Sequence, residues 1–313
     1  MLIKPKFWDQ KKISPYSIIL YPLSLILMLK NFVFHFIPKK KFRIKSICVG
    51  NIYLGGTGKT PLVIKLYELL NNNKFNVATA KKDYKNQRDE QILLKKHSKF
   101  LKASSRKKIF VKAMNNKIDL LLFDDGLQEF NIDYDLKFVC FKNKTFIGNG
   151  RIIPAGPLRE KLSSIKKYDA IFLNGDKNCL NNIKIIKDIS VKIPIFLTNY
   201  KIANLNSFQK STNYYLFSGI GDPSSLKEIL IKNDIKIIKE KIYPDHYCYS
   251  VKEIQMILNE AKQLNAKIIT TEKDYVKIPI KYKKKINIIK IDLVIKNQNR
   301  LLNLIKNTLN EKN

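Results

Sequence analysis

The segment Asn51–Thr60 reads Asn-Ile-Tyr-Leu-Gly-Gly-Thr-Gly-Lys-Thr and combines glycines with a lysine and a hydroxyl residue. In such a loop, backbone N–H groups surround phosphate oxygens, Lys59 reaches the β and γ phosphates and Thr60 ligates Mg²⁺. The strict phosphate-loop pattern would place its first glycine at Tyr53, and the doubled Gly55-Gly56 supplies similar freedom two positions later. A glycine-rich turn without a ligand is the alternative. The expected nucleotide contacts are Gly55, Gly56, Thr57, Gly58, Lys59 and Thr60.

A second chemical signal is the run Ile118–Asp125, an apolar stretch that ends in two carboxylates. If this stretch is a strand, Asp124 and Asp125 lie at the carboxyl edge of a parallel sheet, where one or both can hold Mg²⁺. Together with the loop, this pattern predicts nucleoside triphosphate hydrolysis or transfer. It leaves open which aspartate touches the metal.

Three further clusters are candidates. Arg88-Asp89-Glu90 opens a helical stretch, where the alternative is a carboxylate that merely suits the helix dipole. His246 lies in a turn that precedes a helix. The loop Gly148–Glu160 is rich in Gly, Pro and Arg, which is typical of an anion-binding element, although a plain loop is the alternative.

The elements that must position these residues alternate between strands and helices. A helix is expected over Thr60–Asn72, where the apolar residues recur on one face. The expected strands of the first set are Lys45–Gly50, Phe75–Ala80, Ile118–Phe123, Leu136–Phe141, Ala170–Leu173 and Ile193–Thr198. The second set is strand Tyr214–Ser218, helix Ser224–Lys232, strand Ile235–Ile238, helix Val251–Leu264, strands Lys267–Thr271 and Ile286–Leu293, and a helix near Leu301–Leu309.

This alternation predicts the α/β class, a phosphate-loop NTPase-like fold whose mostly parallel sheets are covered by helices. The stretch between the two sets, residues 200–213, is polar and irregular, which indicates a domain boundary. We therefore expect an N-terminal segment over 1–40, a kinase-type domain over 41–200, and a smaller α/β domain over 201–313 that closes over the active site.

The N-terminal segment is apolar and has no charged residue from Ile13 to Leu29. Its length is borderline for a spanning helix, and Pro22 and Lys30 weaken a simple span. Basic residues flank both sides, which favours a segment in the membrane interface. A core helix of a soluble domain is the alternative. No cleavable signal peptide is indicated, because the first alanine is Ala78.

Composition excludes several classes. The chain has 313 residues, 45% of them hydrophobic, with only 11 glycines and 11 prolines, so disordered and fibrous classes do not fit. The net charge is +33, but only six of the 59 basic residues are arginine and the lysines are diffuse. We interpret this charge as a compositional bias and expect no nucleic-acid partner. The four cysteines form no C-x-x-C, which fits a reducing compartment.

In combination, these motifs resemble the tetraacyldisaccharide 4'-kinase family of lipid A biosynthesis. The matching stretches are Val49–Pro61 (VGNIYLGGTGKTP), Asp124–Gln128 (DDGLQ), Gly148–Glu160 (GNGRIIPAGPLRE), Ser218–Pro223 (SGIGDP), Pro244–Tyr247 (PDHY) and Thr270–Lys277 (TTEKDYVK). Their order spans nearly the whole chain, which makes the resemblance specific.

The resemblance implies transfer of the γ-phosphate of ATP, with Mg²⁺, to the 4'-hydroxyl of tetraacyldisaccharide 1-phosphate, giving lipid IVA. It implies an enzyme on the cytoplasmic face of the bacterial inner membrane; we expect attachment through the N-terminal segment and a monomer. It also implies a catalytic dyad of Asp89 and His246 and metal binding at Asp124 and Asp125, next to the Thr60 ligand that the loop pattern predicts. The residues expected to contact substrate are Tyr84, Glu90, Gln128, Asn149, Arg151, Arg159 and Glu160.

The chain departs from the family after its second strand. The family carries Ser-Arg-Gly-Tyr-Gly there, followed by a long excursion before its Asp-Glu pair. Here the corresponding residues are Lys81-Lys-Asp-Tyr-Lys85, and Asp89 follows almost at once. The competing interpretation is a membrane-associated ATPase or GTPase switch, which would turn over nucleotide without a lipid acceptor.

Overall fold

The computed structural model describes residues 4–10, 12–84, 87–175 and 177–310. The chain divides into two compact units. The first comprises Met1–Asp83, Ser98–Asn199 and Val294–Asn313, and the second comprises Tyr84–His97 and Tyr200–Leu293. A border near residue 200 was expected. In addition, the segment 84–97 groups with the second unit, and the C-terminal residues group with the first.

The first unit is built on an eight-stranded sheet in the order β14-β9-β8-β7-β2-β5-β3-β4. Its strands are β2 (Lys45–Gly50), β3 (Val77–Lys82), β4 (Phe100–Ala103), β5 (Leu120–Asp124), β7 (Leu136–Lys142), β8 (Ala170–Asn174), β9 (Ile195–Ile202) and β14 (Ile291–Ile295). The ladders from β9 through β4 are parallel. The central strands β2, β5, β7 and β8 are largely buried and mostly apolar, as expected of a parallel sheet covered on both faces.

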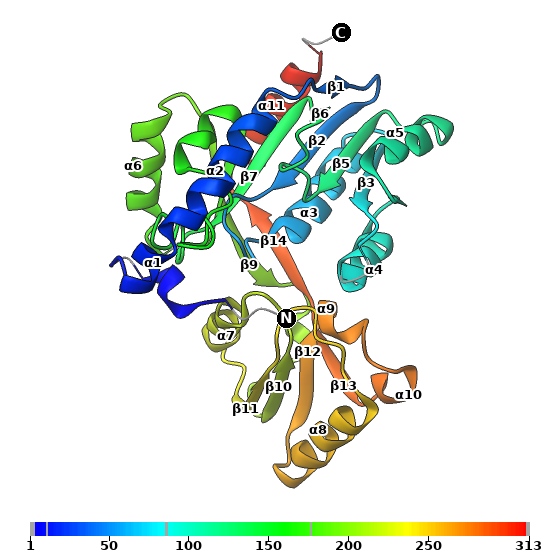
Figure 1. The fold of residues 1–313 in the computed structure, drawn as a ribbon. Coiled ribbons are helices and arrows are strands. Elements are labelled where there is room, and N and C mark those ends of the chain that lie inside the picture. Colours follow the sequence, from blue (N-terminus) through cyan, green and yellow to red (C-terminus); the bar gives the residue numbers. More distant parts are fainter. Residues whose placement is uncertain (1–3, 11, 85–86, 176, 311–313) are drawn as a thin grey trace. The chain divides into compact units, whose positions relative to one another are not determined.

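Helices α3 (Lys59–Asn72) and α5 (Arg106–Asn115) contact strands β2 to β5 (Figure 1). Successive side chains of a strand face opposite sides of the sheet. Phe123 therefore packs with Phe110 of α5, whereas the next residue, Asp124, faces Thr60 of α3. The other helices of this unit are η3 (Leu162–Lys167), α6 (Cys179–Ile189) and α11 (Gln298–Asn310).

The N-terminal residues of the first unit form η1 (Lys6–Asp9), α1 (Pro15–Ile19) and α2 (Tyr21–His35). Strand β1 (Lys40–Lys41) then pairs in parallel with β6 (Ile132–Asp133). Within the part of the chain that the structure describes, no helix combines the length and the apolar character needed to cross a membrane. The expected membrane helix is therefore not shown by the fold.

The second unit holds a four-stranded parallel sheet in the order β11-β10-β12-β13. Its strands are β10 (Tyr214–Ser218), β11 (Ile237–Ile242), β12 (Lys267–Thr271) and β13 (Ile286–Ile289). Its helices are α4 (Arg88–His97), η4 (Leu205–Ser207), α7 (Pro223–Lys232), α8 (Val251–Gln263), α9 (Glu272–Tyr275) and α10 (Ile280–Lys283). The expected α/β class with mostly parallel sheets is confirmed in both units.

The expectation of one strand over Ile286–Leu293 is wrong. The segment forms two strands, β13 and β14, which belong to different sheets. Lys290 separates them: its N–H donates to Asn204 Oδ1 at 2.9 Å, and its carbonyl accepts from Ala203 N–H at 2.8 Å. These bonds take the backbone out of the smaller sheet at a point where the side-chain pattern alone shows no break.

The core of the first unit yields a stability prediction. Phe110 is fully buried and stacks on Phe42 with ring centroids 4.0 Å apart. We expect Phe110→Ala to lower the free energy of unfolding by about 3 to 5 kcal/mol through a lost apolar contact and a cavity. The neighbouring Val111 is exposed, so Val111→Ala should change it by less than about 0.5 kcal/mol. Urea unfolding followed by circular dichroism measures both, and equal effects would contradict the assigned core.

Candidate functional site

The glycine-containing loop joins β2 to α3, as expected. Gly55 and Gly58 adopt φ values of 141° and 89°, which residues other than glycine rarely adopt. Asn51 Nδ2 donates to the Gly55 carbonyl at 3.2 Å and supports the loop from below. The loop therefore leads into the N-terminus of a 14-residue helix. The unpaired N–H groups and the positive dipole end of such a helix suit the binding of an anion.

Asp124 ends β5 beside this helix, and its carboxylate is buried. Its Oδ2 accepts from Thr60 Oγ1 at 2.9 Å and from Lys81 Nζ at 2.7 Å. Its Oδ1 is buried and has no hydrogen-bond partner among the described residues. A buried acceptor without a donor is costly, so this oxygen is suited to a ligand such as a cation or its bound water.

Asp125 follows with φ 61° and lies near two cations. Its carboxylate oxygens are 3.7 Å from Lys59 Nζ and 3.4 Å from Arg159 Nη1. Arg159 also donates to Gln128 Oε1 at 2.6 Å. Gln128 in turn donates to the Asn51 carbonyl at 3.1 Å. Four predicted residues, Lys59, Asp125, Gln128 and Arg159, are thus brought together at the carboxyl edge of the sheet.

Mg²⁺ fits this arrangement. Among the described residues there is no group of three or more His, Cys, Asp or Glu side chains that could hold a metal by themselves. Mg²⁺ characteristically takes one or two carboxylates and completes its octahedron with water and substrate phosphates. The unpartnered oxygen of Asp124 next to the Thr60 hydroxyl supplies hard oxygen donors of this kind.

The other residues expected in this region have structural partners. Asn149 Nδ2 donates to Ser17 Oγ at 3.3 Å and to the Ala155 carbonyl at 3.0 Å. Arg151 donates to the Ser17 carbonyl at 3.2 Å. The Glu160 carboxylate accepts from Tyr168 at 2.6 Å. The structure thus places Asn149 and Arg151 in contact with the N-terminal helices, and their substrate contacts stay a prediction.

The N-terminal helices contact the rest of the first unit through both apolar and polar side chains, and Leu27 and Met28 pack against Tyr53, Ile152 and Leu158. Ser17 and Ser24 are fully buried and donate to the carbonyls of Ala155 and Ile152 at 2.6 and 2.8 Å. The outward residues are large and apolar. The residues more than half exposed are Ile13, Tyr16, Ile18, Ile19, Leu23, Ile26, Leu29, Phe32, Val33 and Phe36. Exposed apolar residues that gather on two short helices are typical of an interaction site.

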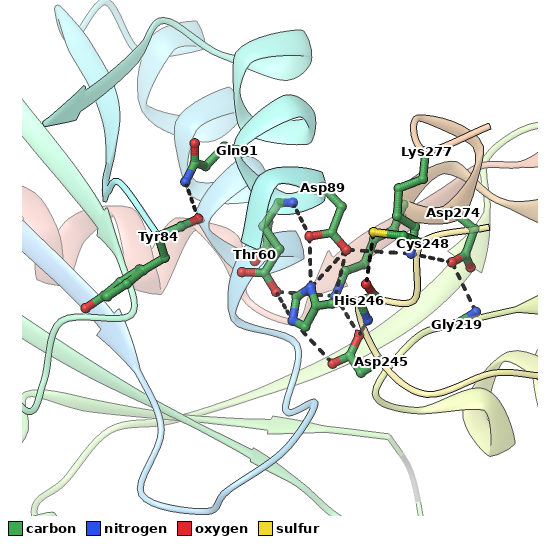
Figure 2. A network of polar contacts seen from close by, with 12 residues as sticks. Thr60, Tyr84, Asp89, Gln91, Gly219, Asp245, His246, Cys248, Asp274 and Lys277 are labelled. Atoms are coloured by element: carbon green, nitrogen blue, oxygen red, sulfur yellow. Dashed lines mark hydrogen bonds and ion pairs between the residues drawn. The ribbon is translucent and has the colours of Figure 1, made fainter. Parts of the chain in front are cut away.

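In the second unit the structure brings Asp89 and His246 together (Figure 2). His246 Nδ1 lies 2.8 and 2.9 Å from the two carboxylate oxygens of Asp89. Asp89 is in the first turn of α4 and is almost completely buried. His246 has φ 62°, and its N–H donates to Asp245 Oδ1 at 3.0 Å, which fixes the turn that presents the imidazole.

Lysines surround this pair. Lys273 Nζ lies 2.9 Å from Asp245, 3.4 Å from Glu90 and 3.7 Å from Asp89, and Lys277 Nζ lies 3.8 Å from Asp89. Burial by itself raises the pKa of Asp89, but the hydrogen bond with His246 and the charges of Lys273, His246 and Lys277 outweigh it. The net pKa of Asp89 lies below its usual value, so the carboxylate is ionised at neutral pH.

Asp274 anchors the loops that carry these groups and is itself fully buried. One oxygen accepts from Gly219 N–H at 3.0 Å (Figure 2). The same oxygen accepts from the Tyr249 hydroxyl at 2.8 Å, and the other accepts from Thr271 at 2.7 Å. Lys277 Nζ is 2.8 Å away and balances the charge. One carboxylate therefore joins the loop after β10, the loop before α8 and the end of β12.

The predicted substrate residues of this unit differ in their surroundings. Glu90 Oε1 lies 3.8 Å from His246 Nε2, at the edge of the dyad. Tyr84 lies just before α4, and its carbonyl accepts from Gln91 at 3.1 Å.

Four charged residues of the site were not predicted from the sequence: Lys81, Lys273, Asp274 and Lys277. The last three lie in the stretch TTEKDYVK, so the motif was the available signal, whereas nothing distinguished Lys81 in a lysine-rich chain.

The charge around Asp89 yields a pH prediction. We expect Lys273→Met to raise the pKa of Asp89, because it removes a cation that favours the carboxylate. In the wild type this carboxylate contributes stability above its unfolded pKa of about 3.9, and that stability is lost as pH falls through the lower folded value. NMR titration of the Asp89 carboxyl measures the shift. Lys210→Met, at an exposed pair with Asp234, is the control, and an unchanged Asp89 pKa in Lys273→Met would contradict the assignment.

Comparisons with known proteins agree on one family. The family model described as "Tetraacyldisaccharide-1-P 4'-kinase" matches residues 15–310. A relative from Pelagibacter ubique named tetraacyldisaccharide 4'-kinase is 45% identical over 317 residues, covering 100% of this chain and 99% of the relative. One of the same name from Rickettsia bellii is 33% identical over 302 residues, covering 88% and 90%.

A solved structure shows the same fold. The crystal structure of LpxK from Aquifex aeolicus in complex with ATP matches with a TM-score of 0.69 at 22% sequence identity. The match covers 93% of this chain and 99% of that chain. At this identity the likeness concerns the fold alone, and it supports the phosphate-loop NTPase-like class that the sequence predicts.

Proposed function

The chain belongs to the tetraacyldisaccharide-1-P 4'-kinase family, and on this premise we propose that it transfers the γ-phosphate of ATP to the 4'-hydroxyl of tetraacyldisaccharide 1-phosphate. The observation that carries the proposal is the phosphate loop, with Thr60 bonded to Asp124 and Lys59 facing Asp125. The product is lipid IVA, an intermediate of lipid A biosynthesis.

Phosphoryl transfer needs positioning and neutralisation of charge more than covalent chemistry. The loop N–H groups and Lys59 would bind the β and γ phosphates. Mg²⁺, when bound at Thr60 and Asp124 or Asp125, supplies positive charge to the phosphate oxygens. Arg159 and Gln128 would orient Asp125 at the same edge of the sheet, because both belong to its hydrogen-bonded chain.

Asp89 and His246 would act on the acceptor hydroxyl. An ionised carboxylate can accept the hydroxyl proton or align the O–H bond, and the histidine bonded to it can hold its orientation. The depressed pKa of Asp89 makes it a weak base. That strength suffices in a loose transition state, where the hydroxyl proton leaves late and alignment matters most.

The lipid substrate keeps its acyl chains in a bilayer, so the enzyme has to work at a membrane surface. The outward apolar face of α1 and α2 would lie in the membrane interface, and the buried serines would hold these helices on the protein. Lysines flank the segment and suit anionic head groups. We propose attachment to the cytoplasmic face of the inner membrane, with the chain acting as a monomer.

The transferase assignment predicts a specific loss of product in dyad variants. In mixed micelles with Mg²⁺ and ATP, the wild type should form the 4'-phosphorylated lipid. Asp89→Asn and His246→Ala should reduce the rate by about a hundredfold or more, because general acid–base catalysis contributes about 10²–10⁴. His97→Ala is the matched control, since His97 also pairs with a carboxylate, Glu272, at 3.1 Å, and should retain the wild-type rate. ATP hydrolysis without lipid product would contradict the kinase proposal and support the interpretation as a nucleotide switch.

The membrane assignment predicts that charge on the outward face weakens binding to vesicles. Ile19 and Ile26 are 73% and 66% exposed. The double substitution Ile19→Glu/Ile26→Glu should lower cosedimentation with anionic vesicles at least tenfold, because it places carboxylates in the interface. Leu180→Glu, at an 83% exposed leucine of α6, controls for surface charge. Equal loss in both variants would contradict a binding face formed by α1 and α2.

A further inference from the structure

Lys81 is the only lysine among the described residues that is buried as a whole, with 1% of its surface exposed. It lies near the end of β3, and the register Ala80↔Phe123 places it beside Asp124 of β5. Burying an ammonium group costs several kcal/mol unless a charge compensates it. Asp124 Oδ2, at 2.7 Å, supplies that charge.

This ion pair changes the charge of the metal site. Asp124 and Asp125 are the two carboxylates that end β5. Three cations of the described part of the chain lie within ion-pair distance of them: Lys81 at 2.7 Å, Arg159 at 3.4 Å and Lys59 at 3.7 Å. Five charges therefore sum to a positive site, which repels a divalent cation. The phosphates of a nucleotide would reverse the sign.

The pair also distinguishes the two oxygens of Asp124. Oδ2 is taken by Lys81 and Thr60, whereas Oδ1 has no hydrogen-bond partner among the described residues. The pair with Lys81 thereby leaves Oδ1 as the oxygen available to a metal ion or its bound water. Lys81 acts through Asp124 and is a positioning residue.

We propose that Lys81 is an internal counter-ion that prevents a divalent cation from binding at Asp124 until nucleotide supplies the missing negative charge. The metal therefore enters with the nucleotide rather than before it. The inference rests on the proposed function for the identity of the ligand, but the charge of the site can be tested without any kinase activity.

The test measures Mn²⁺ binding by electron paramagnetic resonance on nucleotide-free protein. The wild type should show no site tighter than the millimolar range. Lys81→Met keeps the length of the side chain, removes its charge and should bind one Mn²⁺ per chain at least tenfold more tightly. Lys102→Met is the control, because Lys102 lies on the neighbouring strand β4, has the same charge and is exposed. It should behave as the wild type.

A double variant separates charge from packing. Lys81→Met/Asp124→Asn removes both members of the buried pair and should return Mn²⁺ binding to the wild-type level. A purely structural lysine would leave Mn²⁺ binding of the folded single variant unchanged, and that result would overturn the proposal. So would a tight Mn²⁺ site in nucleotide-free wild type that Asp124→Asn abolishes, and this measurement does not require any Lys81 variant to fold.

The same samples test the proposed nucleotide function separately from the role of Lys81. With a non-hydrolysable ATP analogue, the wild type should gain one Mn²⁺ site per chain. If it gains none, the proposed nucleotide function fails, while the comparison of wild type with Lys81→Met in the absence of nucleotide still decides the role of Lys81.

Discussion

Each of the two units contains a buried aspartate, and the need to compensate the charge of its carboxylate constrains the surrounding structure. Each buried aspartate needs hydrogen-bond donors and a counter-charge, and each obtains at least one donor from a segment distant in sequence. Asp124, at the end of β5, accepts hydrogen bonds from Thr60 and Lys81. Asp274 contacts two loops, through Gly219 and Tyr249, and also Thr271 at the end of β12 and Lys277. The charged groups that would act on substrate are therefore fixed before any ligand arrives, which lowers the cost of organising them during reaction.

The same constraint determines what Asp89 can do. Both of its oxygens face His246, and two lysines lie within 4 Å of Oδ2. A carboxylate so surrounded is stabilised as an anion, which makes it a poor nucleophile and a weak base. It remains able to align a hydroxyl group and to receive its proton at the end of transfer. The central claim of the proposed mechanism is accordingly that this pair handles a proton and never carries the phosphoryl group.

Sequence patterns predicted the elements that have strong local signals. The strands Lys45–Gly50, Tyr214–Ser218 and Lys267–Thr271 have the expected bounds, because continuous apolar runs mark buried parallel strands. Strand β4 and helices α5 and α6 were missed: β4 has four residues, and lysines interrupt the apolar pattern of the helices.

Contacts between residues that are distant in sequence were harder to predict. Asp89 and His246 were paired through the family resemblance rather than through any local pattern, and the structure brings them together. Lys81 could not be predicted, because its role depends on Asp124, which is remote in sequence, whereas Asp274 lies in the motif TTEKDYVK but its contact with Gly219 was not evident from that motif. The most direct test of the mechanism is the stereochemistry of transfer from ATP whose γ-phosphoryl group is made chiral with oxygen isotopes. Direct transfer to the lipid hydroxyl predicts inversion at phosphorus, and retention would reveal a phosphorylated enzyme intermediate and contradict the account.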